Sequence, residues 1–283
     1  MMPAARARGA TFRRILVGLD SSAPSLAALD AAVRLAVELE AELEGLFIED
    51  VNLLHFAGLP FTRVIDAASS QARAIDRPDL ERELRARAES VRRKLASAAG
   101  ERVSWTFRVV RGQVEAEFMA AAREADLVSI GFVGDRRGGA AGTGSLARRA
   151  VLESPGSVLL LRCQQGAGSP VAVCLDDGRH GDRALDCAAS LAKSQGGGLT
   201  VVTFAGDENE ERDIEARATD RLGDFGLKPR FLHLGAAGAH DLDAASRAAQ
   251  GGVLVVSAES PLVGGELLRT LVENCACSLL LAR

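Results

Sequence analysis

The chain has 283 residues, of which 47% are hydrophobic and 25% are charged, and its 34 basic and 38 acidic side chains give a net charge of −4. This length is typical of about two domains, and the apolar content excludes an intrinsically disordered chain. The slight acidic excess argues against a protein that binds nucleic acid through an overall basic surface. No apolar run approaches the ~20 residues of a transmembrane helix, so no membrane contact is expected. Five cysteines, an odd number in a long chain, argue against a disulfide framework and favour the reducing cytoplasm.

The first residues form a basic segment. Residues 1–13 carry Arg6, Arg8 and Arg13, contain no acid, and lack the apolar stretch of a secretory signal. A short organelle-targeting segment is one interpretation of the arginines. A flexible, solvated tail is favoured, because chain termini are usually loosely held.

Short β-branched runs then alternate with amphipathic stretches of helical period, a pattern typical of βαβ units around a parallel sheet. The expected strands of the first half are 14–19, 44–48, 103–110, 126–131 and 157–162, and the helices are 25–39, 79–99, 114–124 and 146–153. The segment 50–77, interrupted by Pro60, has no clean period.

The same order of elements returns in the second half. The expected strands are 171–175, 199–204, 230–234, 253–257 and 279–282, and the helices are 182–193, 208–225, 240–250 and 265–274. Residues 15–20 align with 171–176 and residues 146–162 align with 267–283 without gaps, while 50–77 has no counterpart. The sequence therefore predicts an α/β protein with two tandem open, mostly parallel five-stranded sheets flanked by helices. The expected domains are 14–163 and 170–283, joined by a linker over 164–169.

The stretch 131–145 is rich in glycine and reads Gly-Phe-Val-Gly-Asp-Arg-Arg-Gly-Gly-Ala-Ala-Gly-Thr-Gly-Ser. It begins where a buried strand is expected to end and finishes where a helix is expected to begin. Backbone amides at a helix N-terminus, approached closely through glycines, form an anion cradle. Ser145 there can cap the helix and contact a phosphate oxygen. A Gly-rich connector that binds nothing is the alternative.

The spacing Gly131-x2-Gly134-x9-Gly144-Ser145 resembles the nucleotide-binding signature of the universal stress protein family, G-x2-G-x9-G-S/T. Asp20 at the end of the first strand, the turn at 112–115 and the strand 125–131 are also similar to that family. The resemblance covers nearly the whole chain as two tandem copies, and it implies a Rossmann-like, adenine-nucleotide-binding fold.

The resemblance also implies which residues hold ATP, with or without Mg²⁺. The end of the first strand and that of the second hold adenine and ribose, which corresponds to Gly18, Leu19, Asp20 and Ile48. The signature holds the phosphates, which corresponds to Gly131, Gly134, Gly144, Ser145 and the amide of Leu146. Arg136 and Arg137 either pair with phosphates or are solvated loop charges. Phe132 and Val133 are more apolar than the pair often found between the first two glycines.

The second copy lacks these features. Ser257 and Ser260 stand where glycines stood, only residues 261–264 separate Ser260 from Gly265, and Glu266 replaces the phosphate-binding hydroxyl. Asp176 corresponds to Asp20, but alone it is better explained as a turn residue. We therefore expect ATP in the first copy only.

Other candidate sites are weaker. Asp176, Asp177, His180 and Asp182 crowd one loop, but they lack the spacing of a helical zinc site, so we expect no metal there. His55, His233 and His240 have no recognisable nucleophile partner. No evident general base accompanies the Gly-rich loop, so at most slow ATP hydrolysis is expected.

The function expected from the sequence is that of a cytoplasmic, ATP-binding regulator of a stress response, with no catalytic residues. An interaction module without nucleotide is the main alternative. A Rossmann dehydrogenase is disfavoured because Gly142-x-Gly144-x2-Ala147 does not directly follow a strand. An ATP pyrophosphatase is disfavoured because 18–22 lacks the leading Ser-Gly of that loop. The apolar strands 157–162 and 278–283 are expected to pair as an intramolecular pseudo-dimer, with a further homodimer optional.

Overall fold

The computed structural model describes residues 12–59, 63–65, 72–74, 76–132, 143–162, 170–176, 181–196, 198–235, 239–249, 251–264 and 277–283. The first half contains β1 (Arg14–Gly18), α1 (Ala23–Leu39), β2 (Glu42–Asp50), α2 (Val51–Ala57), β3 (Arg63–Ile65), β4 (Ala72–Ala74), α3 (Arg77–Ala99), β5 (Trp105–Gly112), α4 (Val114–Ala122), β6 (Leu127–Phe132), α5 (Thr143–Glu153) and β7 (Ser157–Arg162). The second half contains β8 (Val171–Leu175), α6 (Gly181–Ser194), β9 (Leu199–Phe204), α7 (Glu208–Gly223), β10 (Arg230–Leu234), α8 (Ala239–Ala248), β11 (Val253–Ser257), a 3₁₀ turn (Pro261–Val263) and β12 (Ser278–Ala282).

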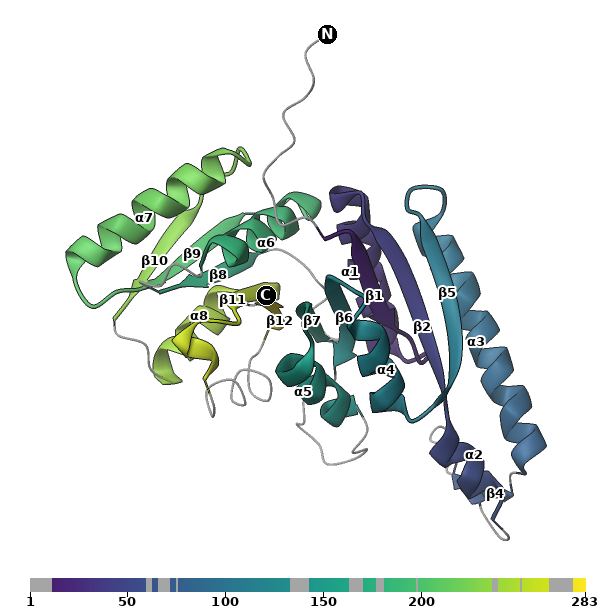
Figure 1. The fold of residues 1–283 in the computed structure, drawn as a ribbon. Helices are drawn as coiled ribbons and strands as arrows, with labels where there is room; N and C mark the ends of the chain where they lie inside the picture. The colour runs from purple at the N-terminus through teal and green to yellow at the C-terminus, as the bar shows by residue number, and fades with distance from the viewer. Residues whose placement is uncertain are drawn as a thin grey trace.

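Ten strands form one sheet in the order β10-β9-β8-β11-β12-β7-β6-β1-β2-β5 (Figure 1). The two halves therefore have the same strand order from the centre of the sheet outward. This order is β7-β6-β1-β2-β5 in the first half and β12-β11-β8-β9-β10 in the second. Neighbouring strands of this sheet run parallel except at the centre, where β12 and β7 are antiparallel. The α/β class and the parallel, helix-flanked sheet are as the sequence predicts.

The two expected five-stranded sheets are joined into one continuous sheet, because the last strands of the two halves pair with each other. At the centre, Leu279 pairs with Leu160, Leu280 with Leu159 and Leu281 with Val158. These leucines and valine are buried on both faces of the sheet. An unpaired strand of this kind would expose apolar side chains and a row of backbone groups, and pairing removes both costs.

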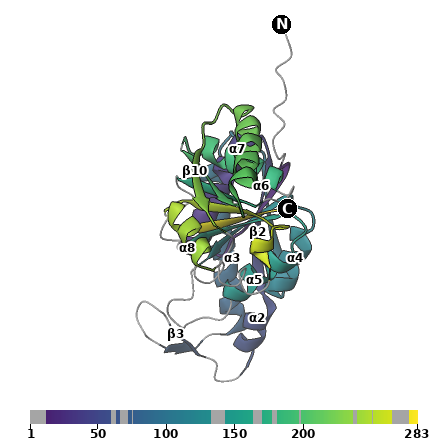
Figure 2. The same cartoon turned by 90° about the vertical axis from the view of Figure 1, so that its left-hand side faces the viewer.

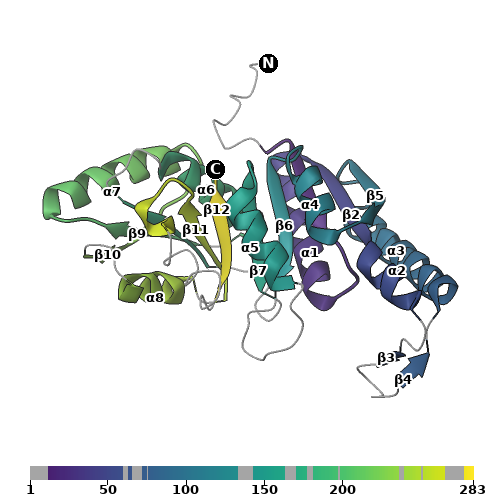
Figure 3. The same ribbon diagram turned by 60° about the horizontal axis from the view of Figure 1, so that its bottom comes forward.

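Two helical layers cover the sheet, one on each face (Figures 1 and 3). Side chains alternate along β1, with Ile15 and Val17 facing the layer of α1, α3, α6 and α7, and Leu16 facing the layer of α4, α5 and α8. The two apolar clusters each run through both halves of the chain. The halves therefore share a continuous core on each side of the sheet.

The segment 50–77, for which the sequence predicts no regular structure, contains α2 and the small hairpin β3–β4. It extends away from the main body next to α3 (Figures 2 and 3). The Asp50 carboxylate caps α2 by accepting the Asn52 N–H at 2.8 Å, and Leu54 packs against Leu84 and Ala88 of α3. A helix of seven residues is too short to give a clear period, which explains why the sequence pattern misses it.

The observed start of the first half differs from the expected one. Phe12 is 2% exposed and belongs to the core, and the Arg13 N–H donates to the Asp126 carboxylate at 2.7 Å. The expected tail over 1–13 is therefore too long by at least these two residues, because the burial of Phe12 fixes them. The expected linker over 164–169 and the expected helix over 265–274 lie outside the described residues. Within the described part of the chain, none of the helices has the length and apolar character needed to cross a bilayer.

Candidate functional site

The site residues expected from the sequence lie at one edge of the first half of the sheet. Strand β1 pairs in parallel with β2 on one side and with β6 on the other, so all three carboxyl ends meet at the same edge. The chain leaves β1 toward β2, and β6 then lies on the opposite side of β1. Such a change of direction opens the crevice in which open α/β sheets bind ligands.

Asp20 is held in a tight turn between β1 and α1. Its Oδ1 accepts the Ser22 N–H at 2.9 Å, and its own N–H donates to Ser25 Oγ at 3.3 Å. Ser21 takes a positive φ of 70°, and the Ser22 side chain caps α1 by accepting the Ser25 N–H at 3.3 Å. The turn therefore fixes an exposed carboxylate beside the N-terminus of α1.

Gly131 lies where α1 crosses the end of β6. A Cβ atom at this position would lie 2.1 Å from the backbone carbonyl of Pro24 and 2.6 Å from the Ser25 nitrogen. The buried Ser129 hydroxyl, two residues earlier, donates to the Ala28 carbonyl at 3.2 Å. Gly131 therefore lets the start of α1 rest on β6, a packing role that the sequence analysis did not assign to it.

Gly144, Ser145 and Leu146 form the first turn of α5, which begins at Thr143, three residues before the predicted start. Ser145 is exposed and Leu146 is partly buried. The helix is tied to α4 by Arg149, which lies 3.7 Å from Glu115, and Arg149 also pairs with Glu153 of α5 at 3.0 Å. The N–H groups in the first turn of a helix have no partner within the helix, and this end carries a partial positive charge, so the start of α5 suits an anion.

The other expected residues lie on neighbouring strands. Leu19 is buried and donates its N–H to the Leu46 carbonyl at 2.9 Å, and Gly18 leaves room for the Phe118 ring, which would be 2.9 Å from a Cβ there. Ile48 and Leu146 are partly buried against the same apolar cluster. The structure thus places eight of the eleven expected residues, and Gly134, Arg136 and Arg137 lie outside the described residues.

The corresponding edge of the second half is built differently. The Ser260 hydroxyl donates a hydrogen bond to the Asp176 carboxylate, although Asp176 is the counterpart of Asp20. Ser257, the counterpart of Gly131, is buried and accepts the Glu259 N–H at 3.3 Å. Asp176 is therefore more than a turn residue, because it is linked to the end of β11. Glu266 lies outside the described residues.

The loop considered for a cation is only partly described. Asp177 and His180 lie outside the described residues. Asp182 lies 2.9 Å from Arg221, and Arg221 also contacts both carboxylate oxygens of Asp186 at 2.6 Å. Asp182 therefore belongs to an ion-pair group between α6 and α7.

A cavity of about 530 Å³ lies elsewhere, among α1, α3 and α6. It is lined by the C-terminal parts of these helices, including Arg34 and Lys193, by Arg102 just after α3, and by Asp30 and Glu38. Helix α1 starts at the carboxyl edge of the strands, so its C-terminal part lies at the opposite edge. None of the nucleotide-binding residues expected from the sequence lines this cavity.

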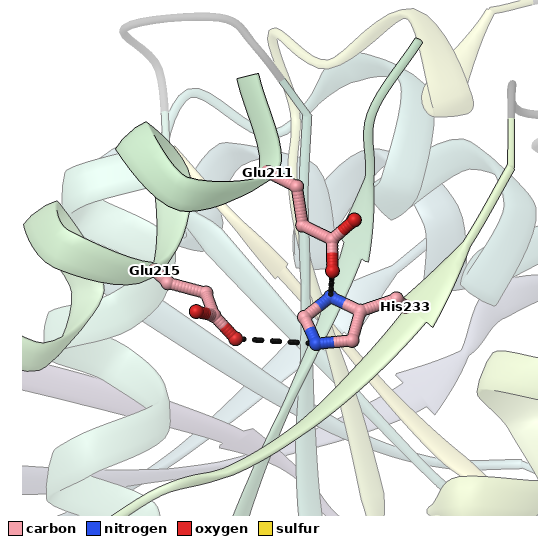
Figure 4. A group of neighbouring side chains, drawn as sticks. All are labelled: Glu211, Glu215 and His233. Carbon is pink, nitrogen blue, oxygen red and sulfur yellow. Dashed lines mark ion pairs between the residues drawn. The ribbon is translucent and has the colours of Figure 1, made fainter. Parts of the chain in front are cut away.

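Among the described residues, the sequence does not predict the contact of His233 with two glutamates. His233 of β10 lies between Glu211 and Glu215 of α7, with ring nitrogens 2.7 and 3.1 Å from the two carboxylates (Figure 4). The spacing of four residues between the glutamates is a visible signal for one helical face. The contact with His233 joins residues far apart in sequence, and nothing in the sequence announces it.

The fold and the carboxyl-edge site define the chain as an α/β protein of the Rossmann-like kind. The family model of the universal stress protein family matches residues 11–162, which is more than half of the sequence, and the chain belongs to this family. A search of curated proteins finds no match.

Solved structures share the fold over nearly the whole chain. A universal stress protein from Archaeoglobus fulgidus has a TM-score of 0.66 at 16% identity, with 95% of this chain and 98% of that chain covered. A putative universal stress protein from Pseudomonas aeruginosa has a TM-score of 0.51 at 15% identity, covering 96% and 93%. The cytoplasmic domain of a prokaryotic cation chloride cotransporter has a TM-score of 0.54 at 15% identity, covering 95% of each chain. At these identities the likeness concerns the fold.

Proposed function

We propose that this protein is a tandem universal stress protein that binds ATP in its first half and acts as a nucleotide-dependent regulator in a stress response. The observation that carries the proposal is that α1 and α5 both begin at the carboxyl edge of the strands, the same edge that presents the exposed Asp20 carboxylate. Family membership and the spacing of the signature from Gly131 to Ser145 support the same assignment. The second half acts as a structural partner paired through β7 and β12.

The described residues divide naturally between the parts of the nucleotide. The Asp20 carboxylate can accept hydrogen bonds from ribose hydroxyls, and the partly buried Ile48 offers an apolar contact to adenine. The Ser145 hydroxyl and the amides of Gly144 and Leu146, at the start of α5, suit the phosphates. Arg136 and Arg137 belong to the same loop in sequence and would add positive charge, and Mg²⁺ would accompany the phosphates.

Restriction of ATP to the first half is supported by the contrast between Asp20 and Asp176. Asp20 is exposed and bonded within its own turn, whereas Asp176 accepts a hydrogen bond from Ser260. A ribose hydroxyl would compete with the Ser260 hydroxyl for Oδ2 of Asp176. Glu266 would also place a negative charge where Ser145 stands in the first half, which repels phosphate.

The test is direct. Nucleotide released from the purified full-length chain is identified by mass spectrometry, and titration calorimetry with ATP measures the stoichiometry. We expect ATP or ADP in the released material and one site per chain. Two equivalent sites would contradict the assignment to the first half, and complete absence of nucleotide binding would favour an interaction module. Conversion of the bound ATP to ADP over hours would identify slow hydrolysis.

Matched variants locate the site. Gly134→Glu and Gly144→Glu each place a carboxylate where backbone is expected to approach phosphate, and both should reduce ATP affinity by at least 100-fold. Gly265→Glu places the same group at the sequence counterpart of Gly144 in the second half and should leave the affinity unchanged. Equal effects of Gly144→Glu and Gly265→Glu would remove the Gly-rich loop from the proposed site.

A further inference from the structure

The side-chain group of Glu211, Glu215 and His233 lies in the second half, away from the edge proposed for ATP. The glutamates come from one face of α7, and His233 comes from β10, the strand at the end of the sheet (Figure 4). Glu211 Oε1 lies 2.7 Å from His233 Nδ1, and Glu215 Oε1 lies 3.1 Å from Nε2. One ligand atom from each residue lies within 4.8 Å of the others, a spacing compatible with a single bound ion.

A neutral imidazole cannot satisfy both carboxylates. It carries one N–H group and one lone pair, so one of its nitrogens has no proton to donate. The nitrogen without the proton then faces a carboxylate oxygen, and the two lone pairs repel. Either a second proton, which makes the group an ion pair, or a metal cation at this nitrogen removes the repulsion.

The contacts of Nδ1 indicate which nitrogen of the neutral ring keeps the proton. Thr203 pairs with His233 in the sheet, its side chain is 0% exposed, and its hydroxyl lies 2.9 Å from Nδ1. Glu211 is the nearer of the two carboxylates and can only accept, so the ring proton lies on Nδ1, where the Thr203 hydroxyl can share it. The Nε2 lone pair is then directed at Glu215.

The surroundings favour a cation. Between residues 207 and 215 the chain carries six acids, Asp207, Glu208, Glu210, Glu211, Asp213 and Glu215, against the single base Arg212. Arg212 pairs with Glu208 at 3.1 Å, one turn before Glu211. The ring and both carboxylates are about one-third exposed, so an ion from solution has access and water can complete its coordination.

We propose that Nε2 of His233 and the Glu215 carboxylate bind a divalent transition-metal ion of the Zn²⁺ class. Glu211 is a positioning residue: it accepts the Nδ1–H and holds the ring, as carboxylates commonly do for metal-binding histidines. The nitrogen ligand excludes Mg²⁺ and Ca²⁺, which prefer all-oxygen sites. The Glu215 side chain moves slightly to admit the ion, which its exposure allows.

Calorimetric titration of the full-length chain with ZnCl₂ at neutral pH tests the proposal. We expect one site that Mg²⁺ does not compete for, so the result is independent of ATP binding in the first half. His233→Asn should abolish this site, and Glu215→Gln should weaken it at least 10-fold. Glu211→Gln should weaken it about 10-fold, as loss of such a hydrogen-bond partner does.

Two variants serve as matched controls. Glu208→Gln removes the same charge from α7 one turn away, and His55→Asn removes an exposed histidine of α2; both should leave Zn²⁺ affinity unchanged. Nitrogen NMR of the histidine rings should show a Zn²⁺-induced shift at Nε2 of His233. Absence of Zn²⁺ binding, or binding that survives His233→Asn, would overturn the proposal and leave the group as an ion pair only. Thermal unfolding without metal checks that each variant folds.

Discussion

The Ser157 hydroxyl accepts a hydrogen bond from the Arg283 N–H at 3.0 Å, and so joins the first half of the chain to the last strand of the second. The equivalent contact joins the equivalent residues of the other half. Ser278 of the second half accepts, through its hydroxyl, the N–H of Arg162 in the first half at 3.2 Å. Both serines are fully buried. The central strand pair is thus closed at each end by the same interaction, as an approximate two-fold relation between the halves requires.

This relation predicts equal contributions from the two serines. Ser157→Ala and Ser278→Ala each remove the side-chain acceptor of a partly buried backbone N–H, so each should reduce the free energy of unfolding by about 1 kcal/mol. Urea denaturation measures the change, with the exposed Ser97→Ala of α3 as a control that should shift it by less than about 0.5 kcal/mol. A large cost for one serine and none for the other would show that the two ends of the strand pair are not equivalent.

Gly131 should not tolerate a side chain. Gly131→Ala places a methyl group 2.1 Å from the Pro24 backbone, and the start of α1 would have to move away from β6. We expect a loss of about 2–3 kcal/mol in stability, typical of an overpacked contact. Gly223→Ala, at the end of α7 with no atom within 4 Å of its Cβ, is the control and should cost nothing. Thermal melts compare the two, and similar melting temperatures would contradict the close packing.

The Arg221 ion pair should stabilise the contact between α6 and α7. Asp186 is only 8% exposed in its side chain and depends on the two hydrogen bonds from Arg221. Arg221→Met leaves this carboxylate unpaired and should cost about 2 kcal/mol, below the range for fully buried pairs because Arg221 is 34% exposed. Arg212→Met breaks the exposed pair with Glu208 and should cost less than about 0.5 kcal/mol. Denaturant titration measures the free energy of unfolding of both variants. Equal losses would show that the Arg221 pair stabilises the protein no more than an exposed ion pair does.

Cys187 should make the fold less stable at high pH. Burial raises the pKa of its thiol from 9.0 to about 12. Between these two values the unfolded chain loses a proton that the folded chain keeps, so stability falls by up to about 1.4 kcal/mol per pH unit. Stability should therefore be unaffected by this group below pH 9 and decline above it.

The comparison with Cys187→Ala isolates this effect. The variant has a lower stability at neutral pH because it leaves a small cavity, but its slope between pH 9 and 11 should be shallower than that of the parent chain. The same burial predicts that Cys187 resists alkylation by iodoacetamide at pH 8 until the protein is unfolded. Rapid labelling in the folded state, or parallel slopes, would contradict the burial argument.

Much of the fold can be predicted from the sequence, because the signals involved are local. The strand 157–162 is predicted with its observed limits, since an apolar run between Gly156 and Arg162 leaves little choice. Helix α1 begins two residues before the predicted start at Ser25, because Ser22 caps it and Pro24 fits the first turn. The pairing of β12 with β7 is expected from their apolar character, but its register depends on contacts between residues more than 100 positions apart.

The candidate site can be predicted only in part. The spacing from Gly131 to Ser145 locates the loop, yet the contact of Gly131 with Pro24 depends on how α1 crosses the sheet, which a linear pattern does not contain. The same holds for Ser260 and Asp176, whose hydrogen bond joins two loops far apart in the chain. The Glu211 and His233 contact is missed for the same reason. Sequence reasoning finds residues that are close in the chain, and packing brings the others together.

The antiparallel pairing of β7 and β12 also has a consequence for the protein in solution. Two separate chains joined by such strands would come apart on dilution, whereas here the second partner is tethered and its effective concentration is fixed by the covalent connection. The melting temperature should therefore not depend on protein concentration. The outer strands of the sheet, β5 and β10, carry Arg108, Arg111 and Arg230, and such charged edges discourage a further strand from adding. We therefore expect no further strand to join the ten-stranded sheet.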